Sequence, residues 1–145
     1  MDWQQAWDQL GQRGYRKTQQ RMIVVKEVFA GGCLQGAEEI LSRCREKDGG
    51  ISMPTVYRTL DMLVDAGLVR RVNLGLGRTW FEPGGPDDDH HHHLVCEQCG
   101  KREKIALCPL GIVENEAKRS GFKVRELHFE AVGLCRSCAA KERKK

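Results

Sequence analysis

Two CxxC pairs constrain this chain more than any other feature of its sequence. Cys96 and Cys99 form the first pair, Cys135 and Cys138 form the second, and 35 residues lie between the pairs. Each pair presents two sulfurs to one ion, and two pairs complete the tetrahedral four-thiolate shell that zinc prefers in structural sites. Because this shell leaves no open coordination position, we predict a structural Zn²⁺ ion rather than a catalytic one.

The rest of the sequence favours metal binding over disulfide formation. The chain has seven cysteines, an odd number, and its N-terminus lacks the basic and then apolar pattern of a secretory signal. It has no run of about 18 apolar residues, so we expect no membrane partner. These features predict a cytoplasmic protein, and in that reducing compartment paired cysteines are metal ligands or redox centres. A thioredoxin-like CxxC needs a βαβ setting, which the pattern does not offer.

The first part of the chain has the pattern of a winged helix-turn-helix. Apolar spacing predicts four helices, over residues 3–10, 19–30, 37–44 and 53–66. Thr18 and Ser52 can cap the second and fourth of them. Residues 68–72 and 78–82 are predicted to be two strands joined by a glycine-bearing turn. In a winged helix-turn-helix one helix enters the major groove of DNA and such a hairpin flanks it.

The second part of the chain has the pattern of a small α+β domain. Residues 83–89 are rich in Pro, Gly and Asp, which is typical of a hinge. Short strands are expected near residues 94–95 and 104–105, a helix over about 109–120 and a strand over 122–132. We therefore predict an α+β protein with a winged-helix domain over 1–82, a hinge over 83–89 and a metal-binding domain over 90–145.

Charge alone does not identify a nucleic-acid-binding protein here. The net charge is +4, and residues 1–82 and 83–145 each hold 12 basic and 10 acidic residues. The case must therefore rest on where individual residues lie. Arg58 and Tyr57 lie on the expected exposed face of the fourth helix, where they can read a base edge and pack on a thymine methyl group. Arg16 and Arg78 are basic candidates for contacts with DNA, although most surface arginines are simply solvated.

Four consecutive histidines, His90 to His93, form a second group of candidate ligands. In a strand, alternation sends His91 and His93 to one face and His90 and His92 to the other, so the run can serve two sites. Imidazole suits zinc, iron, nickel and copper, so the run does not select a metal. The alternative is a solvated polar edge of the sheet.

Together these residues resemble the ferric uptake regulator (Fur) family of metal-responsive bacterial repressors. The resemblance spans nearly the whole chain and is carried by Gly14-Tyr15-Arg16-Lys17-Thr18, Ala37-Glu38-Glu39-Ile40, Pro54-Thr55-Val56-Tyr57-Arg58-Thr59-Leu60, Ala66-Gly67-Leu68-Val69, the histidine run with Leu94-Val95-Cys96, and Gly133-Leu134-Cys135. It implies a homodimer without enzymatic activity, in which the C-terminal domain carries the dimer interface. It also implies that the N-terminal domain binds double-stranded DNA, at a palindromic AT-rich operator.

The resemblance also implies roles for single residues. It gives DNA recognition to Tyr57 and Arg58, and a place near the DNA backbone or minor groove to Arg16. It assigns the structural zinc to the four cysteines of the CxxC pairs.

A regulatory site for Fe²⁺ or Zn²⁺ is implied at Glu82, His91 and His93. The family usually has a further histidine ligand just before the Ala-Glu-Glu stretch, but this chain has Leu34 there. We hypothesise that its neighbour Cys33 supplies the missing ligand, which would shift the site toward softer metals such as zinc. Glu82 stands where peroxide-sensing relatives have an Asp, which argues against that variant.

An additional metal site of the family would use the other face of the histidine run, with an acidic residue and a histidine from the C-terminal domain. The candidates in this chain are His90, His92 and His128. The chain departs from the pattern, because Lys104 and Gly111 stand where acidic residues are common and Leu127 takes the place of the histidine.

The leading hypothesis is a metal-dependent DNA-binding repressor that controls metal-ion homeostasis by sensing iron or zinc. Metal binding between the domains would fix their angle and so the spacing of two recognition helices. Two alternatives stay open. A zinc-ribbon thiol-redox protein would need an open metal position or a cysteine with a lowered pKa. A zinc-stabilised dimerisation module would lack specific DNA binding.

Overall fold

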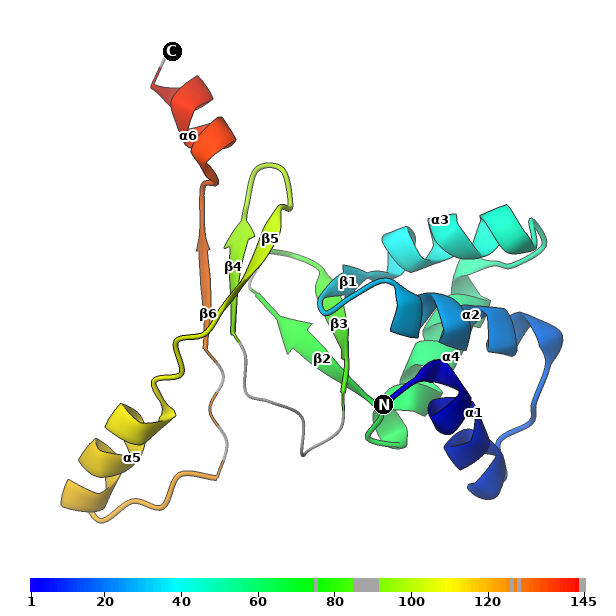
Figure 1. The fold of residues 1–145 in the computed structure, drawn as a ribbon, viewed down its shortest axis with the longest axis horizontal. Coiled ribbons are helices and arrows are strands. Elements are labelled where there is room, and N and C mark those ends of the chain that lie inside the picture. The colour runs from blue at the N-terminus through cyan, green and yellow to red at the C-terminus, as the bar shows by residue number, and fades with distance from the viewer. Residues whose placement is uncertain (75, 85–91, 126, 128, 144–145) are drawn as a thin grey trace. The chain divides into compact units, whose positions relative to one another are not determined.

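The computed structural model describes residues 1–74, 76–84, 92–125, 127 and 129–143. The chain divides into two compact units, Met1–Asp88 and Asp89–Lys145, and each is described by itself (Figure 1). Residues 85–89 of the predicted hinge lie outside the described residues, and Pro83 is the last residue of a strand. No helix in the described part of the chain is long and apolar enough to cross a membrane.

The first unit contains the four predicted helices. They are α1 (Trp3–Gln12), α2 (Gln19–Ala30), α3 (Ala37–Lys47) and α4 (Met53–Asp65). The Asp2 carboxylate accepts a hydrogen bond from the Gln5 backbone N–H at 2.8 Å and caps α1. Thr18 caps α2 in the same way, as its sequence position predicts. Ser52 occupies the N-cap position of α4, but its hydroxyl bonds to Thr55 Oγ1 instead of to the backbone.

The helices pack around one apolar core. Its fully buried members lie at helical spacing on the inner faces of all four helices: Ala6, Leu10, Val24, Val25, Val28, Ile40, Cys44, Val56, Leu60 and Leu63. The spacing that predicts the helices is therefore also the spacing that buries them. On α4 this leaves the opposite face exposed.

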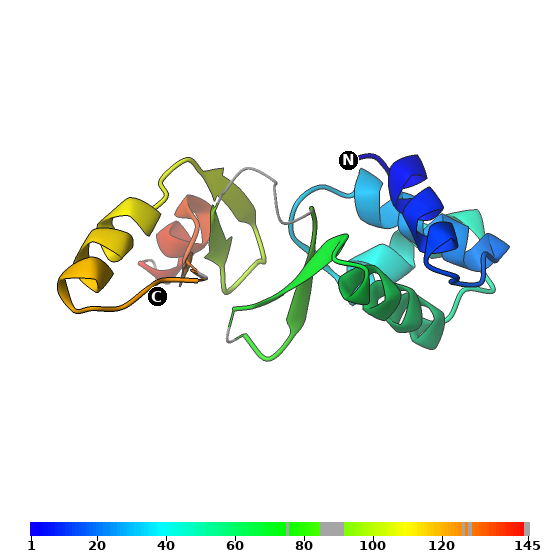
Figure 2. The ribbon, with the colours of Figure 1, turned by 90° about the horizontal axis from the view of Figure 1, so that it is seen from below.

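A three-stranded antiparallel sheet completes the first unit, in the order β1-β3-β2. The strands are β1 (Gln35–Gly36), β2 (Val69–Asn73) and β3 (Thr79–Pro83). The last two form the predicted hairpin, which Figure 2 shows beside α4. The sequence did not predict β1, which consists of two residues in the connection between α2 and α3. Its pairing with β3 places that connection along the outer edge of the hairpin.

The second unit contains a three-stranded mixed sheet in the order β5-β4-β6. Its elements are β4 (His92–Cys96), β5 (Arg102–Ile105), α5 (Leu110–Arg119), β6 (Glu130–Gly133) and α6 (Arg136–Glu142). Strand β4 pairs antiparallel with β5 and parallel with β6. The prediction of a strand over 122–132 was too long, because pairing with β4 begins only at Glu130. Helix α6 was not predicted.

The second unit has few buried apolar side chains. Among its described residues these are Val95, Cys96 and Cys138. Helix α5 buries none of its side chains, and Ile112 on this helix is 74% exposed. Phe122, just beyond the helix, is also 74% exposed. The unit therefore offers apolar surface that its own described residues do not cover.

Candidate metal centres and nucleic-acid interface

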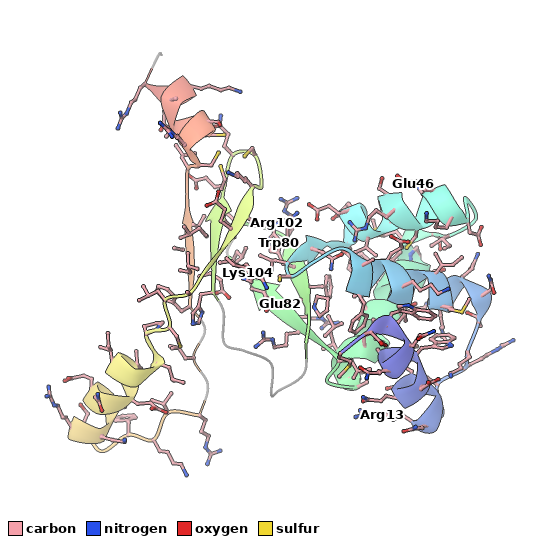
Figure 3. The ribbon with its side chains drawn as sticks, in the orientation of Figure 1. Arg13, Glu46, Trp80, Glu82, Arg102 and Lys104 are labelled. Carbon is pink, nitrogen blue, oxygen red and sulfur yellow. The ribbon has the colours of Figure 1, made fainter. Side chains whose placement is uncertain are left out.

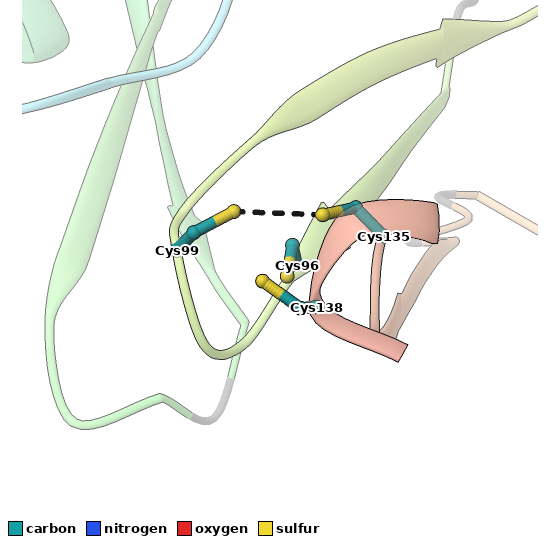
Figure 4. A group of neighbouring side chains, drawn as sticks. All are labelled: Cys96, Cys99, Cys135 and Cys138. Atoms are coloured by element: carbon teal, nitrogen blue, oxygen red, sulfur yellow. Dashed lines mark hydrogen bonds between the residues drawn. The ribbon is translucent and has the colours of Figure 1, made fainter. Parts of the chain in front are cut away.

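The four cysteines of the CxxC pairs meet at one end of the sheet in the second unit. Figure 4 shows their sulfurs turned toward a common centre. All four Sγ atoms lie within 4.8 Å of one another, and those of Cys99 and Cys135 are 3.6 Å apart. All seven cysteines of the chain are free thiols. The structure thus brings together the complete set that the sequence spacing indicates.

The first cysteine pair sits on a tight turn at the end of β4. The Gly100 N–H donates to the Cys96 carbonyl at 2.9 Å, and the Cys96 N–H donates to the Lys101 carbonyl at 2.8 Å. Gly100 has φ 72°, in the left-handed region that glycine adopts without steric cost. The glycine therefore folds the chain back so that Cys99 lies beside Cys96.

The second cysteine pair is positioned by the parallel pairing of β6 with β4. Cys96 is the register partner of Gly133, so β6 ends where β4 ends. The Glu97 N–H donates to the Gly133 carbonyl at 2.9 Å and extends this contact beyond the ladder. Cys135 is then the N-cap of α6 and Cys138 lies in its first turn. The start of a helix thus presents both sulfurs to the first pair.

The surroundings of the cluster favour thiolates at some of its positions. Hydrogen bonds from the backbone at Cys135 and Cys99 lower the pKa of Cys96 to about 6. A backbone hydrogen bond at Cys138 lowers the pKa of Cys135. Burial raises the pKa of Cys138 to about 12, and the neighbouring Cys135 thiol adds to this shift. Four thiolates cannot gather here without a cation, which matches the requirement of a metal for deprotonated cysteines.

The cluster has the dimensions of a zinc site. A tetrahedral ion with Zn–S bonds of about 2.3 Å holds its sulfurs about 3.8 Å apart. The 3.6 Å separation of Cys99 and Cys135 is close to this value. With four sulfurs, the site has no open position for a substrate.

Two of the predicted regulatory ligands lie together in the first unit. The Cys33 Sγ and a carboxylate oxygen of Glu82 are within 4.8 Å of each other. Glu82 is on β3, where Figure 3 labels it. Cys33 precedes β1, and the pairing of β1 with β3 explains why the two residues meet. A thiol and a carboxylate at this separation can bind the same ion.

Glu82 also has an ion-pair partner that the sequence analysis missed. Arg70 Nη2 donates to Glu82 Oε2 at 2.9 Å, and the two residues are direct register partners across β2 and β3. The Glu82 side chain is only 5% exposed, whereas that of Arg70 is 43% exposed. The predicted strands 68–72 and 78–82 contain both residues, so the hairpin register was the signal that could have paired them.

Gln35 is a second residue that sequence reasoning missed. It is buried, and its Nε2 donates to the carbonyls of Val28 at 2.7 Å and Gly32 at 2.9 Å. Its Oε1 accepts a hydrogen bond from Arg43. These bonds fix the connection that carries Cys33. The sequence offered no signal for this role, because only the tertiary structure buries the amide.

The described histidines of the run lie on β4 in the second unit. His92 and His93 are both buried, and adjacent strand positions point to opposite faces. His92 Nδ1 lies 2.8 Å from the Phe129 carbonyl, and its Nε2 has no hydrogen-bond partner among the described residues. His90, His91 and His128 lie outside the described residues.

The register of β4 and β5 changes the interpretation of Lys104. Lys104 is the register partner of His93, and Ile105 is that of His92. Directly opposed residues share a face of the sheet. The lysine therefore stands on the face of His93, which the sequence analysis assigned to the regulatory site, and not on the face of the additional site.

The four predicted DNA-contacting residues are all exposed on the first unit. Tyr57 and Arg58 lie on the side of α4 opposite to its buried residues, and Tyr57 is 41% exposed. The Arg78 guanidinium carbon lies 4.1 Å from the centre of the Trp80 ring, which positions this side chain on the hairpin. Arg16 precedes α2, and its carbonyl accepts a hydrogen bond from Arg21.

Comparison with known proteins gives one consistent result. The sequence profile described as the Ferric uptake regulator family matches residues 12–132. The zinc uptake regulation protein of Escherichia coli is 30% identical over 132 residues, which are 90% of this chain and 77% of that protein. The peroxide operon regulator of Bacillus subtilis is 30% identical over 139 residues, 95% of this chain and 94% of the relative.

Solved structures agree with the sequence matches. The ferric uptake regulator Fur of Helicobacter pylori, described with three functional metal-binding sites, superposes with a TM-score of 0.81 at 24% identity. The match covers 96% of this chain and 95% of that one. A zinc uptake regulator complexed with zinc and DNA gives a TM-score of 0.62 at 28% identity, over 97% and 95% of the two chains.

The fold and the sequence match lead to the same assignment. The α+β architecture, with an N-terminal helix-turn-helix unit and a small C-terminal α+β unit, is that of the matched structures. The alternative of a thiol-redox enzyme is not supported, because the matched proteins are regulators. The chain belongs to the ferric uptake regulator family of metal-responsive transcription regulators.

Proposed function

We propose that this protein is a homodimeric repressor that binds palindromic AT-rich operator DNA when zinc or iron occupies a regulatory site at Cys33, Glu82, His91 and His93. The observation that carries the proposal is the proximity of the Cys33 sulfur to the Glu82 carboxylate, within 4.8 Å. The first unit thereby supplies half of the proposed ligand set from residues that β1 and β3 hold side by side.

The composition of this ligand set favours zinc. A thiolate is a soft ligand, and a set with one thiolate, one carboxylate and two imidazoles suits Zn²⁺ better than a set without sulfur. The similarity to the zinc uptake regulation protein of Escherichia coli supports the same choice. Iron is the second candidate, because imidazole and carboxylate also bind Fe²⁺.

The four-cysteine cluster is proposed to hold a separate, structural Zn²⁺. Its sulfur spacing supports this assignment, and the closed four-sulfur shell separates it from the regulatory role. A cluster that stabilises the second unit would also support dimerisation there. Exposed apolar residues of that unit, Ile112 and Phe122 among them, offer the surface for a partner copy.

Regulation would follow from the fact that the proposed ligands come from two different units of the chain. Cys33 and Glu82 belong to the unit with the helix-turn-helix, and the two histidines belong to the other unit. Ligands that hold one ion together restrict the orientations of the units. Those orientations set the distance between the two α4 helices of a dimer, and operator half-sites accept only one spacing.

DNA recognition is proposed for Tyr57 and Arg58 on α4, with Arg16 near the DNA backbone or minor groove and Arg78 at a phosphate. Their exposure on one unit supports this proposal. An additional metal site at His90, His92 and His128 has weaker support. Among the described residues only His92 represents it.

Metal-dependent DNA binding tests the proposal directly. The full-length protein, loaded with one zinc equivalent, is titrated with Zn²⁺, Fe²⁺ or Mn²⁺ in a gel shift with an operator selected from random DNA. We expect DNA binding to require the added metal. Of the three ions, Zn²⁺ should support DNA binding at the lowest free concentration. Cys33→Ser should raise the zinc concentration that is needed, whereas Cys108→Ser should not. Binding that is independent of metal would contradict the proposal.

A further inference from the structure

We propose that Arg70 is a built-in counter-ion that occupies the Glu82 carboxylate in the metal-free protein and thereby sets how much metal the regulatory site requires. This inference rests on the proposed function, because it treats Glu82 as a metal ligand. It concerns a residue outside the proposed ligand set.

The geometry makes this ion pair a fixed feature of the hairpin. Arg70 and Glu82 are direct register partners, so the ladder of β2 and β3 holds their backbones opposite each other. The guanidinium reaches Glu82 Oε2 at 2.9 Å. The same carboxylate is the one that lies within 4.8 Å of the Cys33 sulfur. A metal ion and the guanidinium therefore compete for one acidic group.

The different exposure of the two side chains decides which of them can leave. The Glu82 side chain is only 5% exposed, whereas that of Arg70 is 43% exposed. Breaking an ion pair to a buried carboxylate is costly, so Arg70 stabilises Glu82 in the metal-free protein. A divalent cation can replace it, because the arginine can move into solvent where its charge is hydrated.

Electrostatics predicts that Arg70 lowers the affinity of the regulatory site for metal. A positive charge within a few ångströms of a divalent cation repels it, whether the arginine stays on Oε2 or is displaced from it. Arg70 therefore weakens metal binding in either case. The site responds only when the metal concentration is high enough to overcome this competitor.

The neighbouring residue Arg71 provides a matched control. It lies on the same strand, its register partner is Phe81, and it forms an ion pair with Asp61, which is half exposed. Arg70→Met and Arg71→Met remove the same charge and the same hydrogen-bonding group. Only the first substitution removes the ion pair with Glu82.

The experiment is a double-mutant cycle on the full-length protein, with the cysteine cluster first loaded with one zinc equivalent. The affinity for a second Zn²⁺ is measured by competition with a fluorescent chelator. We expect Arg70→Met to bind it about tenfold more tightly and Arg71→Met to match the wild type. Glu82→Gln should weaken binding, and Arg70→Met should tighten binding less in that background, because competition for the carboxylate is then absent and only direct charge repulsion remains. Arg70→Lys, which keeps the charge, should remain near the wild type.

Thermal unfolding of the same loaded proteins, without the second zinc, provides an independent readout. Arg70→Met should lower Tm more than Arg71→Met, because it removes an ion pair to a buried carboxylate, whereas Arg71→Met removes an ion pair between two exposed side chains. Glu82→Gln should remove most of this difference. If Glu82→Gln weakens zinc binding but Arg70→Met does not tighten it, the inference about Arg70 is wrong and the regulatory site stands. If Glu82→Gln leaves the affinity unchanged, Glu82 is not a ligand and both proposals fail.

Discussion

Cys99 and Cys135 are far apart in sequence, yet their Sγ atoms lie 3.6 Å apart. We predict that Cys135→Ser reduces tightly bound zinc from about one equivalent per chain to nearly none, because structural zinc sites use all four ligands. Elemental analysis of protein purified without chelator measures this content. Cys108→Ser, which changes an exposed cysteine of the same unit, should retain the zinc. Full zinc content in Cys135→Ser would show that the cluster is not the tight site.

The buried amide of Gln35 should contribute strongly to stability. Gln35→Ala removes hydrogen bonds to the carbonyls of Val28 and Gly32 and leaves these groups and Arg43 without that partner. Leaving buried polar groups unsatisfied should lower the free energy of unfolding by about 2–4 kcal/mol. Urea unfolding measures the change. Gln4→Ala, at an exposed position of α1, is the control and should change it little.

Arg58 should contribute to sequence-specific DNA binding. Arg58→Ala should weaken binding to a selected operator by about 10- to 100-fold, because a bidentate contact with a base edge is lost. Fluorescence anisotropy with the metal-loaded protein measures the affinity. Arg13→Ala is the control, because it removes an exposed arginine at the end of α1 (Figure 3). It should change the affinity for DNA by no more than a factor of about two to three, which is the effect expected from losing one positive charge that makes no specific contact. Equal losses in both variants would argue against a base contact by Arg58.

Arg78 should contribute in a different way. Its guanidinium lies over the Trp80 ring on the hairpin and not on α4, and we expect it to contact a phosphate. Arg78→Ala should weaken binding to operator and random DNA by similar factors and reduce the salt dependence by about one ion. Affinities at several salt concentrations measure both effects. A loss confined to the operator would instead indicate base recognition.

Cys44 should make the first unit sensitive to alkaline pH. Burial raises the pKa of this thiol to about 11 from 9.0, and Glu27 adds to the shift. Between these values the unfolded chain loses the thiol proton and the folded chain keeps it, so the stabilisation is complete below pH 9 and falls as pH rises.

Comparison with Cys44→Ala isolates this contribution from other groups that titrate at high pH. The difference in unfolding free energy between wild type and variant should shrink by about 1 kcal/mol between pH 8 and pH 10. Urea unfolding with zinc present throughout measures it. A constant difference would mean that folding does not raise the pKa of the Cys44 thiol.

Helices α1 to α5 and the cysteine cluster could be predicted from the sequence because their signals are local. Val56, Leu60 and Leu63 repeat at helical spacing, and this repeat gave α4. The two CxxC pairs carry their ligand geometry in their spacing, and the structure brings the four sulfurs together.

The elements that the sequence did not predict correctly depend on partners distant in the chain. Strand β1 has only two residues and exists because Gln35 and Gly36 pair with β3. The apolar pattern around Phe122 and Val124 favours a strand, but β4 offers pairing only from Glu130 onward. Helix α6 begins at a cysteine with no side-chain capping bond, so its start carries no ordinary capping signal.

The small interior of the second unit makes the maturation of a newly made chain depend on the metal of the cysteine cluster. Among the described residues of that unit, two of the three buried apolar side chains are cysteines of the cluster itself. A newly made chain must therefore acquire an ion before this unit has a stable interior. In a cell starved of zinc, newly synthesised chains would remain immature, and the number of working regulators would reflect the metal supply at the time of their synthesis.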